Sequence, residues 1–204
     1  QNYASVSKLN DGGFVVTWES YSQDSYAYGI FGQRYDSSGI ATGDEFQINT
    51  YTDNTQRYPS VTSLSDGGFV VTWVSGGQDG DGWGIFGQRY DNSGTATCDE
   101  FQINTYTEEA QYNHSITSLS DGGFTVTWFS YHQGSDGNII GQRFDAEGNK
   151  VALLRSGTSP PTVSIAMSDQ DIKVGDTSTV TFTFSEEPTG FTANDVTVAN
   201  GALS

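Results

Sequence analysis

The stretch that decides the fold is Asp11-Gly12-Gly13-Phe14-Val15-Val16-Thr17-Trp18. It recurs unchanged at residues 66–73, and it recurs with one change, Thr125, at residues 121–128. Each copy therefore begins 55 residues after the one before it. Self-similarity at a fixed period indicates a repeat architecture. We expect repeat 1 at residues 1–55, repeat 2 at 56–110 and repeat 3 at 111–157, with a separate module at 158–204.

Two further blocks recur with the same period. Gly-Ile-Phe-Gly-Gln-Arg-Tyr-Asp at 29–36 returns at 84–91 and, altered and one residue early, at 138–145. Glu-Phe-Gln-Ile-Asn-Thr-Tyr-Thr at 45–52 returns at 100–107 and has no clear third copy. Alternating side chains in each block are typical of strands, and Asp-Gly-Gly is typical of a tight turn, because glycine tolerates positive φ. Each repeat is therefore predicted to be a four-stranded antiparallel meander in an all-β fold.

Both faces of the strand at 14–18 are rather apolar, which predicts that neighbouring sheets cover it on both sides. Stacked meanders of this kind are propeller-like blades, but a propeller typically has about 4–8 of them. Further repeats in a longer parent protein, or several chains that complete one ring, would resolve this. A threefold β-prism or β-trefoil is the alternative. Residue 1 begins in register with Gln56 and Gln111, which favours a longer array.

The C-terminal module has a different pattern. Residues 156–161 have the composition of a linker, and residues 162–167 and 178–185 read as strands. The pattern Val-x-x-Gly-Asp, Val-Thr-Phe-Thr-Phe-Ser-Glu, Phe-Thr-x-x-Asp-Val resembles the first half of bacterial immunoglobulin-like domains. A full β-sandwich of that kind needs about 100 residues, so a partial one is expected here, either truncated or completed by another chain.

Charge and composition restrict the possible partners. The net charge is −17, with 8 Lys+Arg against 25 Asp+Glu, which argues against nucleic acid and against anionic lipid. No apolar run reaches membrane-spanning length, so no membrane insertion is expected. The single cysteine, Cys98, stands where repeat 1 has Gly43 and excludes a disulfide within the chain.

The repeat pattern Asp-Gly-Gly-Phe-Val-Val-Thr-Trp, Gly-Gln-Arg-Tyr-Asp, Glu-Phe-x-Ile-Asn-Thr resembles that of large secreted bacterial adhesins of the repeats-in-toxin type. This resemblance covers about residues 1–155 and implies an extracellular or cell-surface location, a role in attachment, and Ca²⁺-rich surroundings. The chain lacks the nonapeptide Gly-Gly-x-Gly-x-Asp repeats that bind Ca²⁺ in those toxins. No cofactor is certain, and Ca²⁺ remains a hypothesis.

Candidate binding residues lie mainly in the variable loop between the second and third strands. Carboxylates beside flat aromatic rings are typical of sugar sites, and the candidates are Asp24, Tyr26, Tyr28, Asp79, Asp81 and Trp83. Oxygen ligands for Ca²⁺ would come from Asp79, Asp81 and Asp136, although turn formation explains the same residues.

Six residues form the structural signature of the repeat: Trp18, Trp73, Trp128, Arg34, Arg89 and Arg143. A residue present in every repeat usually serves the repeat itself, so we expect each arginine to bind a carboxylate or carbonyls between adjacent repeats. No catalytic residue is predicted, because the two histidines pair with no nucleophile in the sequence and the acid pairs recur with the repeat.

The sequence therefore favours a non-enzymatic extracellular module for surface attachment or for matrix or filament assembly. Its expected partners are neighbouring repeats or other copies of the chain. The alternative is a lectin-like domain that binds surface glycans.

Overall fold

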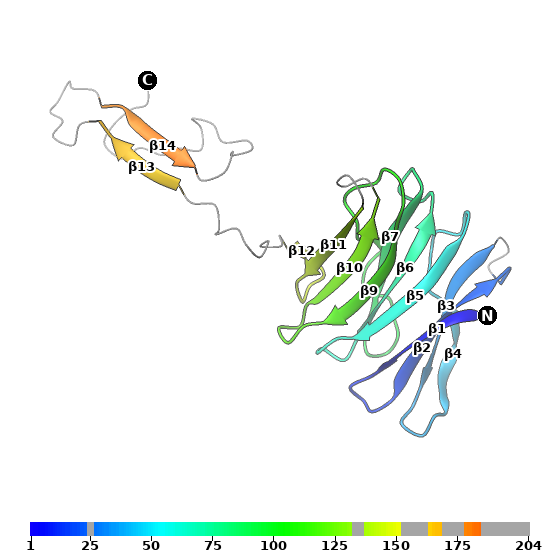
Figure 1. Ribbon diagram of the computed structural model, residues 1–204. Coiled ribbons are helices and arrows are strands. Elements are labelled where there is room, and N and C mark those ends of the chain that lie inside the picture. The colour runs from blue at the N-terminus through cyan, green and yellow to red at the C-terminus, as the bar shows by residue number, and fades with distance from the viewer. Residues whose placement is uncertain (24–26, 132–136, 152–162, 169–177, 185–204) are drawn as a thin grey trace. The chain divides into compact units, whose positions relative to one another are not determined.

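The computed structural model describes residues 1–23, 27–131, 137–151, 163–168 and 178–184, and the statements below concern these residues. The chain divides into two compact units, Gln1–Leu153 and Leu154–Ser204 (Figure 1). The fold is all-β, as predicted. No helix in the described part of the chain has the length and hydropathy needed to cross a membrane.

The N-terminal unit consists of three four-stranded antiparallel sheets, one within each expected repeat. The first contains β1 (Asn2–Lys8), β2 (Phe14–Tyr21), β3 (Tyr28–Tyr35) and β4 (Ala41–Gln47). The second contains β5 (Gln56–Ser63), β6 (Phe69–Gly76), β7 (Trp83–Tyr90) and β8 (Phe101–Gln102). The third contains β9 (Gln111–Ser118), β10 (Phe124–Ser130), β11 (Asn138–Phe144) and β12 (Lys150–Val151). In each sheet the strands lie side by side in chain order, which is the predicted meander.

The Asp-Gly-Gly turns explain why this motif recurs. The Asp11 carboxylate accepts a hydrogen bond from the Gly13 N–H at 2.9 Å, and Gly12 has φ of 88°. A Cβ on Gly13 would lie 2.3 Å from the Tyr35 carbonyl oxygen, so only glycine fits there. The same contacts recur at Asp66 and Asp121, and the turn therefore fixes the start of the second strand in every repeat.

Two hydrophobic clusters hold the three sheets together, and both are composed of equivalent positions. One joins Val15 and Ile30 of repeat 1 to Val61, Phe69 and Trp73 of repeat 2. The other joins the next pair of repeats through the equivalent residues Val70, Ile85, Ile116, Phe124 and Trp128. We call the face of each sheet that packs on the preceding repeat its incoming face, and the opposite face its outgoing face.

The first strands of the three sheets are neighbours, with β1 against β5 and β5 against β9 (Figure 1). The three sheets thus follow one another as blades, and no barrel closes in the described residues. A β-trefoil requires such a barrel, and a closed threefold fold would cover both outer sheets. Val6 in the first sheet is 64% exposed and Ile139 in the third is 74% exposed, so this alternative is wrong for the described residues.

The C-terminal unit is described only at two paired strands, β13 (Val163–Met167) and β14 (Val180–Phe184). These correspond to the two strands predicted there. The expected third element around Phe191 and residues 196–198 lies outside the described residues.

Candidate functional site

A cavity of about 760 Å³ lies along the first strands of the three sheets. It is lined by β1, β5 and β9 together with Val74 of β6 and the first residue of β7. Its walls carry aromatic rings, one cation, one amide and one imidazole, from Tyr3, Arg57, Tyr58, Trp83, Tyr112, Asn113 and His114. Ligand pockets generally measure about 300–1,000 Å³ and combine apolar rings with a few polar groups, so this cavity has the size and lining of a binding site.

A backbone irregularity shapes this cavity in the same way in each repeat. Tyr3, Tyr58 and Asn113 are 55 residues apart in turn, and all three have positive φ, at 51°, 57° and 54°. The pairing of each first strand with the second shifts register at this point. A bulge of this kind re-aims side chains and occurs often beside functional sites. Left-handed conformations at non-glycine residues are costly. Their recurrence at the same position in all three repeats indicates that the bulges are a regular part of the cavity wall.

Arg57 is held at one end of the cavity by a buried carboxylate. Its guanidinium makes a two-nitrogen contact with Glu19, which is fully buried, and the shortest of these bonds is 2.8 Å. The Tyr58 N–H also donates to Glu19, at 3.1 Å. The guanidinium lies over the rings of Tyr28, at 4.6 Å, and Tyr58, at 4.8 Å. The hydrogen bonds that Arg57 donates to Glu19 raise the pKa of Arg57, so the guanidinium keeps its charge.

His114 brings a titratable group to the same cavity. Its two ring nitrogens are buried, and no hydrogen bond of normal geometry reaches either one. Burial lowers the pKa of His114 to about 4, and the nearby Thr72 backbone opposes this only in part. The imidazole is therefore neutral at pH 7. The equivalent positions hold Ala4 and Pro59, so this group is specific to repeat 3.

The structure separates the predicted sugar-binding residues into three groups. Trp83 lines the cavity, and Tyr28 packs on the Arg57 guanidinium at its end. Asp79 and Asp81 have structural partners, because Asp79 accepts a hydrogen bond from the Asn104 side chain at 3.0 Å and Asp81 accepts one from the Glu109 N–H at 2.9 Å. Asp24 and Tyr26 lie outside the described residues.

The predicted Ca²⁺ ligands form no metal site within the described residues. Asp136 lies outside the described residues, and Asp79 and Asp81 make the contacts given above. Within the described ranges, no group of three or more His, Cys, Asp or Glu side chains has the spacing needed to hold a metal ion.

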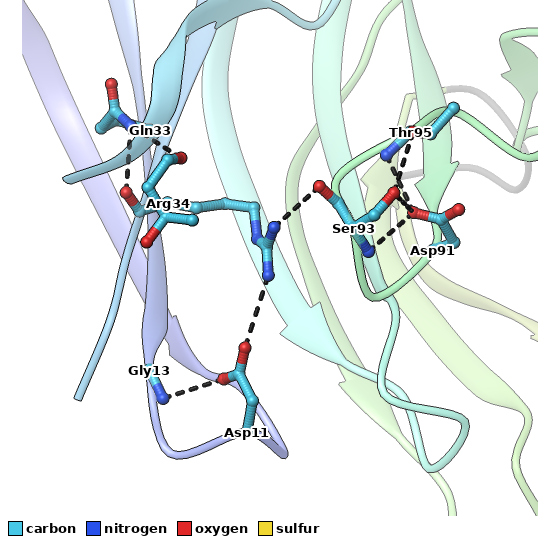
Figure 2. Close-up of polar contacts among 8 residues, drawn as sticks. Asp11, Gly13, Gln33, Arg34, Asp91, Ser93 and Thr95 are labelled. Atoms are coloured by element: carbon cyan, nitrogen blue, oxygen red, sulfur yellow. Dashed lines mark hydrogen bonds and ion pairs between the residues drawn. The ribbon is translucent and has the colours of Figure 1, made fainter.

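The signature arginine joins one repeat to the next (Figure 2). Arg34 donates from Nη1 to the Ser93 carbonyl of repeat 2 at 2.7 Å, and from Nη2 to Asp11 of its own repeat at 3.4 Å. The Asp91 side chain in turn accepts hydrogen bonds from the Ser93 and Thr95 N–H groups, which fixes the turn that receives Arg34.

The other signature residues take equivalent positions. Arg89 and Arg143 pair with the turn aspartates Asp66 and Asp121 of their own repeats, so within the described residues the predicted contact between adjacent repeats is seen for Arg34. Trp73 and Trp128 are buried between repeats, at 0% and 4% exposure. Trp18 lies at the same position on the incoming face of repeat 1 and is only half-buried.

Sequence reasoning missed a buried amide pair that links successive repeats. Asn49 accepts a hydrogen bond from the Ile30 N–H at 2.7 Å and donates to Gln56 of the next repeat at 3.2 Å. Asn104 and Gln111 repeat this arrangement, and both glutamines are fully buried. The signal was present in the sequence, because an asparagine precedes a glutamine by seven residues at both junctions.

Comparisons with known proteins identify the C-terminal part. The family model of a bacterial Ig-like domain matches residues 157–204. The chain therefore carries an Ig-like segment at this end, as the sequence pattern indicated. No protein among those with curated descriptions matches the chain.

Solved structures resemble the fold at low identity. A protein of unknown function from Dyadobacter fermentans DSM 18053 is 13% identical, with a TM-score of 0.52 over 80% of this chain and 56% of that one. An endo-arabinase from Bacteroides thetaiotaomicron VPI-5482 is 11% identical, with a TM-score of 0.46 over 77% of this chain and 57% of that one. An alpha-L-arabinofuranosidase from Lactobacillus brevis is 10% identical, with a TM-score of 0.46 over 85% and 62%. At these identities the likeness concerns the fold alone, and this chain spans 56–62% of the length of those structures.

Proposed function

We propose that this chain is a non-enzymatic structural and adhesive module of a large extracellular bacterial repeat protein. The observation that carries the proposal is the use of its most repeated polar residues. Arg34 and Asn49 each bind the following repeat, and Arg89 and Asn104 occupy the same positions one repeat later. Arg34, Asn49 and Asn104 thus join successive sheets, and the serial joining of sheets is what an extended scaffold requires.

The partners of the carboxylates also support a scaffold. Glu19 binds Arg57, Glu100 accepts hydrogen bonds from the Thr50 N–H and hydroxyl at 2.7 and 3.1 Å, and Asp79 binds Asn104. A glycosidase acid pair needs one carboxyl kept free for proton transfer beside the substrate. These three carboxylates instead hold backbone and side chains within and between repeats.

Surface attachment and catalysis can be tested together. Fluorescent beads coated with the chain should be retained on bacterial exopolysaccharide or on abiotic surfaces more strongly than beads coated with an equally acidic control protein. The soluble chain should release no reducing sugar from arabinan or other polysaccharides. Retention equal to the control would contradict adhesion, and sugar release lost in a carboxylate variant would contradict the non-enzymatic part.

Carbohydrate binding is the second candidate function, and the cavity along the first strands of the three sheets favours it. Tyr58, Tyr112 and Trp83 line the cavity with aromatic rings of the kind on which sugars stack, and Asn113 supplies an amide for hydroxyl groups. A glycan array with the chain at millimolar concentration, with and without Ca²⁺, tests this directly. Absence of any bound glycan would rule out this candidate and leave the scaffold proposal standing.

A matched pair of variants locates the sugar site. Asn113→Gly removes the amide while keeping a residue that accepts positive φ. Asn54→Gly makes the same change at φ of 59°, at an exposed residue that does not line the cavity. Titration calorimetry with a glycan from the array should show weaker binding for Asn113→Gly only.

A further inference from the structure

The three sheets of the N-terminal unit are unequally covered. Every residue of β6 is buried, so this strand has a neighbouring sheet on both faces. In β2, Val15 and Thr17 are buried, and Phe14, Val16 and Trp18 are half-exposed. In β10 the order is reversed: Phe124, Val126 and Trp128 are buried, whereas Thr125, Thr127 and Phe129 are half-exposed or exposed. Among the described residues, repeat 1 thus leaves its incoming face uncovered, and repeat 3 leaves its outgoing face uncovered.

The exposed fractions of equivalent residues show the difference between an uncovered face and a covered one. Val6 on the incoming face of repeat 1 is 64% exposed, whereas Val61 and Ile116 at the same position are 8% and 9% exposed. Ile139 on the outgoing face of repeat 3 is 74% exposed, whereas Ile30 and Ile85 are fully buried. Apolar residues that are buried at two junctions and exposed only at the ends mark a surface suited to another sheet of the same kind.

The arginine that makes the polar contact of the first junction has an equivalent at the outgoing face of repeat 3. The side chains of Arg34 and Arg89 are 11% and 16% exposed, but that of Arg143 is 31% exposed. Arg34 reaches the carbonyl of Ser93, and the residue equivalent to Ser93 in repeat 1 is Ser38. The turn around Ser38 on a second copy is therefore the partner that Arg143 would meet.

The central pair of residues in the proposed contact would be uncharged. At the first junction the central pair is Glu19 with Arg57, and at the second it is Val74 with Tyr112. At a contact between repeat 3 and repeat 1 these two positions hold Phe129 and Asn2, neither of which is charged.

We propose that the outgoing face of repeat 3 binds the incoming face of repeat 1 of a second copy of this chain, head to tail. The contact continues the two junctions already present within one copy, position by position. A head-to-tail contact closes a ring when the rotation allows. Propellers typically have about 4–8 blades, and the three sheets described here from each of two copies would give six. This assembly stands apart from the proposed attachment function and from sugar binding.

Sedimentation velocity of the 204-residue chain over a range of concentrations tests the proposal. The expected species has twice the mass of 22.0 kDa and increases with concentration. Because the contact is apolar and each copy carries a net charge of −17, added NaCl should strengthen it. A chain that remains a monomer at several hundred micromolar in high salt would overturn the proposal.

Single substitutions at the two faces identify the surfaces. Val6→Glu and Ile139→Glu should each raise the dissociation constant by at least about tenfold, because a carboxylate would lose its hydration in the contact. Both residues are exposed, so circular dichroism and the melting temperature should stay unchanged. Ile165→Glu, at a residue 61% exposed in β13, is the control and should associate like the parent chain. Association that persists in both face variants would show that another surface is used.

Mixing the two variants separates a head-to-tail contact from a symmetric one. Val6→Glu keeps an intact outgoing face, and Ile139→Glu keeps an intact incoming face, so an equimolar mixture can form one good contact. The mixture should form a dimer that contains one copy of each variant, at concentrations where neither variant dimerises by itself. Labelling one of the two variants detects this mixed dimer. A mixture without heterodimer would contradict the head-to-tail arrangement.

Discussion

At the scale of single residues, the junction between repeats 1 and 2 buries an ion pair where the next junction is apolar. Glu19 is fully buried and depends on Arg57 for its charge balance. Breaking a buried pair is costly, whereas replacing it by packed apolar groups is often neutral or stabilising. At the junction of repeats 2 and 3, the positions equivalent to Glu19 and Arg57 hold Val74 and Tyr112, which pack together without charge.

The first prediction uses that replacement. Arg57→Ala should destabilise the chain by about 3–5 kcal/mol, because Glu19 is left charged and buried. The double change Glu19→Val with Arg57→Tyr should restore the parent stability or exceed it. Urea unfolding followed by tryptophan fluorescence measures both. A double variant as unstable as Arg57→Ala would show that the ion pair itself is required.

The second prediction concerns the buried imidazole. The pKa of His114 falls from 6.5 to about 4 on folding, so between these values the unfolded chain binds the proton and the folded chain does not. His114 therefore contributes a stability that rises with pH over this window, by roughly 3 kcal/mol, and is lost as the pH falls towards 4. His114→Ala and His114→Pro, the residues of repeats 1 and 2, should flatten the pH dependence of the melting temperature between pH 4 and 6.5. An unchanged profile in both variants would contradict the prediction.

At the scale of elements, alternating side chains determine where each strand lies, and glycines determine where each turn lies. The strand order and the Asp-Gly-Gly turns are the ones that the sequence predicts. The predicted burial of the second strand on both faces holds for β6 alone, since β2 and β10 each lack one neighbouring sheet. The bulges at Tyr3, Tyr58 and Asn113 were not predicted from the sequence, because no glycine marks these left-handed positions.

Two equivalent turn glycines give the third prediction. Gly39 and Gly94 have φ of 80° and 86°, so alanine at either costs about 1–2 kcal/mol for the left-handed conformation. A Cβ on Gly39 meets nothing within 4 Å, but a Cβ on Gly94 lies 2.9 Å from Arg34 Cδ. Gly94→Ala should therefore be the more destabilising of the two in urea unfolding. The difference between them measures the contact of the Arg34 side chain with repeat 2, and equal losses would mean that Arg34 moves aside freely.

At the scale of the whole molecule, acidity and metal binding are separate questions. The net charge of −17 favoured the Ca²⁺ hypothesis. However, Asp79 already accepts a hydrogen bond from Asn104, and Asp81 accepts one from Glu109, both within repeat 2. Asp79 Oδ1 is buried without a hydrogen-bond partner, but within the described residues no group of three metal-ligating side chains forms around it.

The fourth prediction follows for Ca²⁺. Adding a chelator should leave the melting temperature of the chain unchanged, because a ligand stabilises a protein only when it binds the folded state. Calcium titration followed by differential scanning calorimetry checks this. A melting temperature that rises with Ca²⁺ and falls in Asp79→Asn would instead establish the site that the sequence suggested.

The sequence by itself determined the period of 55 residues, the four strands of each repeat, the turn chemistry and the Ig-like pattern at 157–204. These features depend on residues close together in the chain, and a repeat displays them several times. Tertiary structure alone decided which faces are covered, how Glu19 meets Arg57 across 38 positions, and how the strands β1, β5 and β9 form one cavity. Those contacts join residues of different repeats, so they depend on how sheets pack, and no local pattern records that packing.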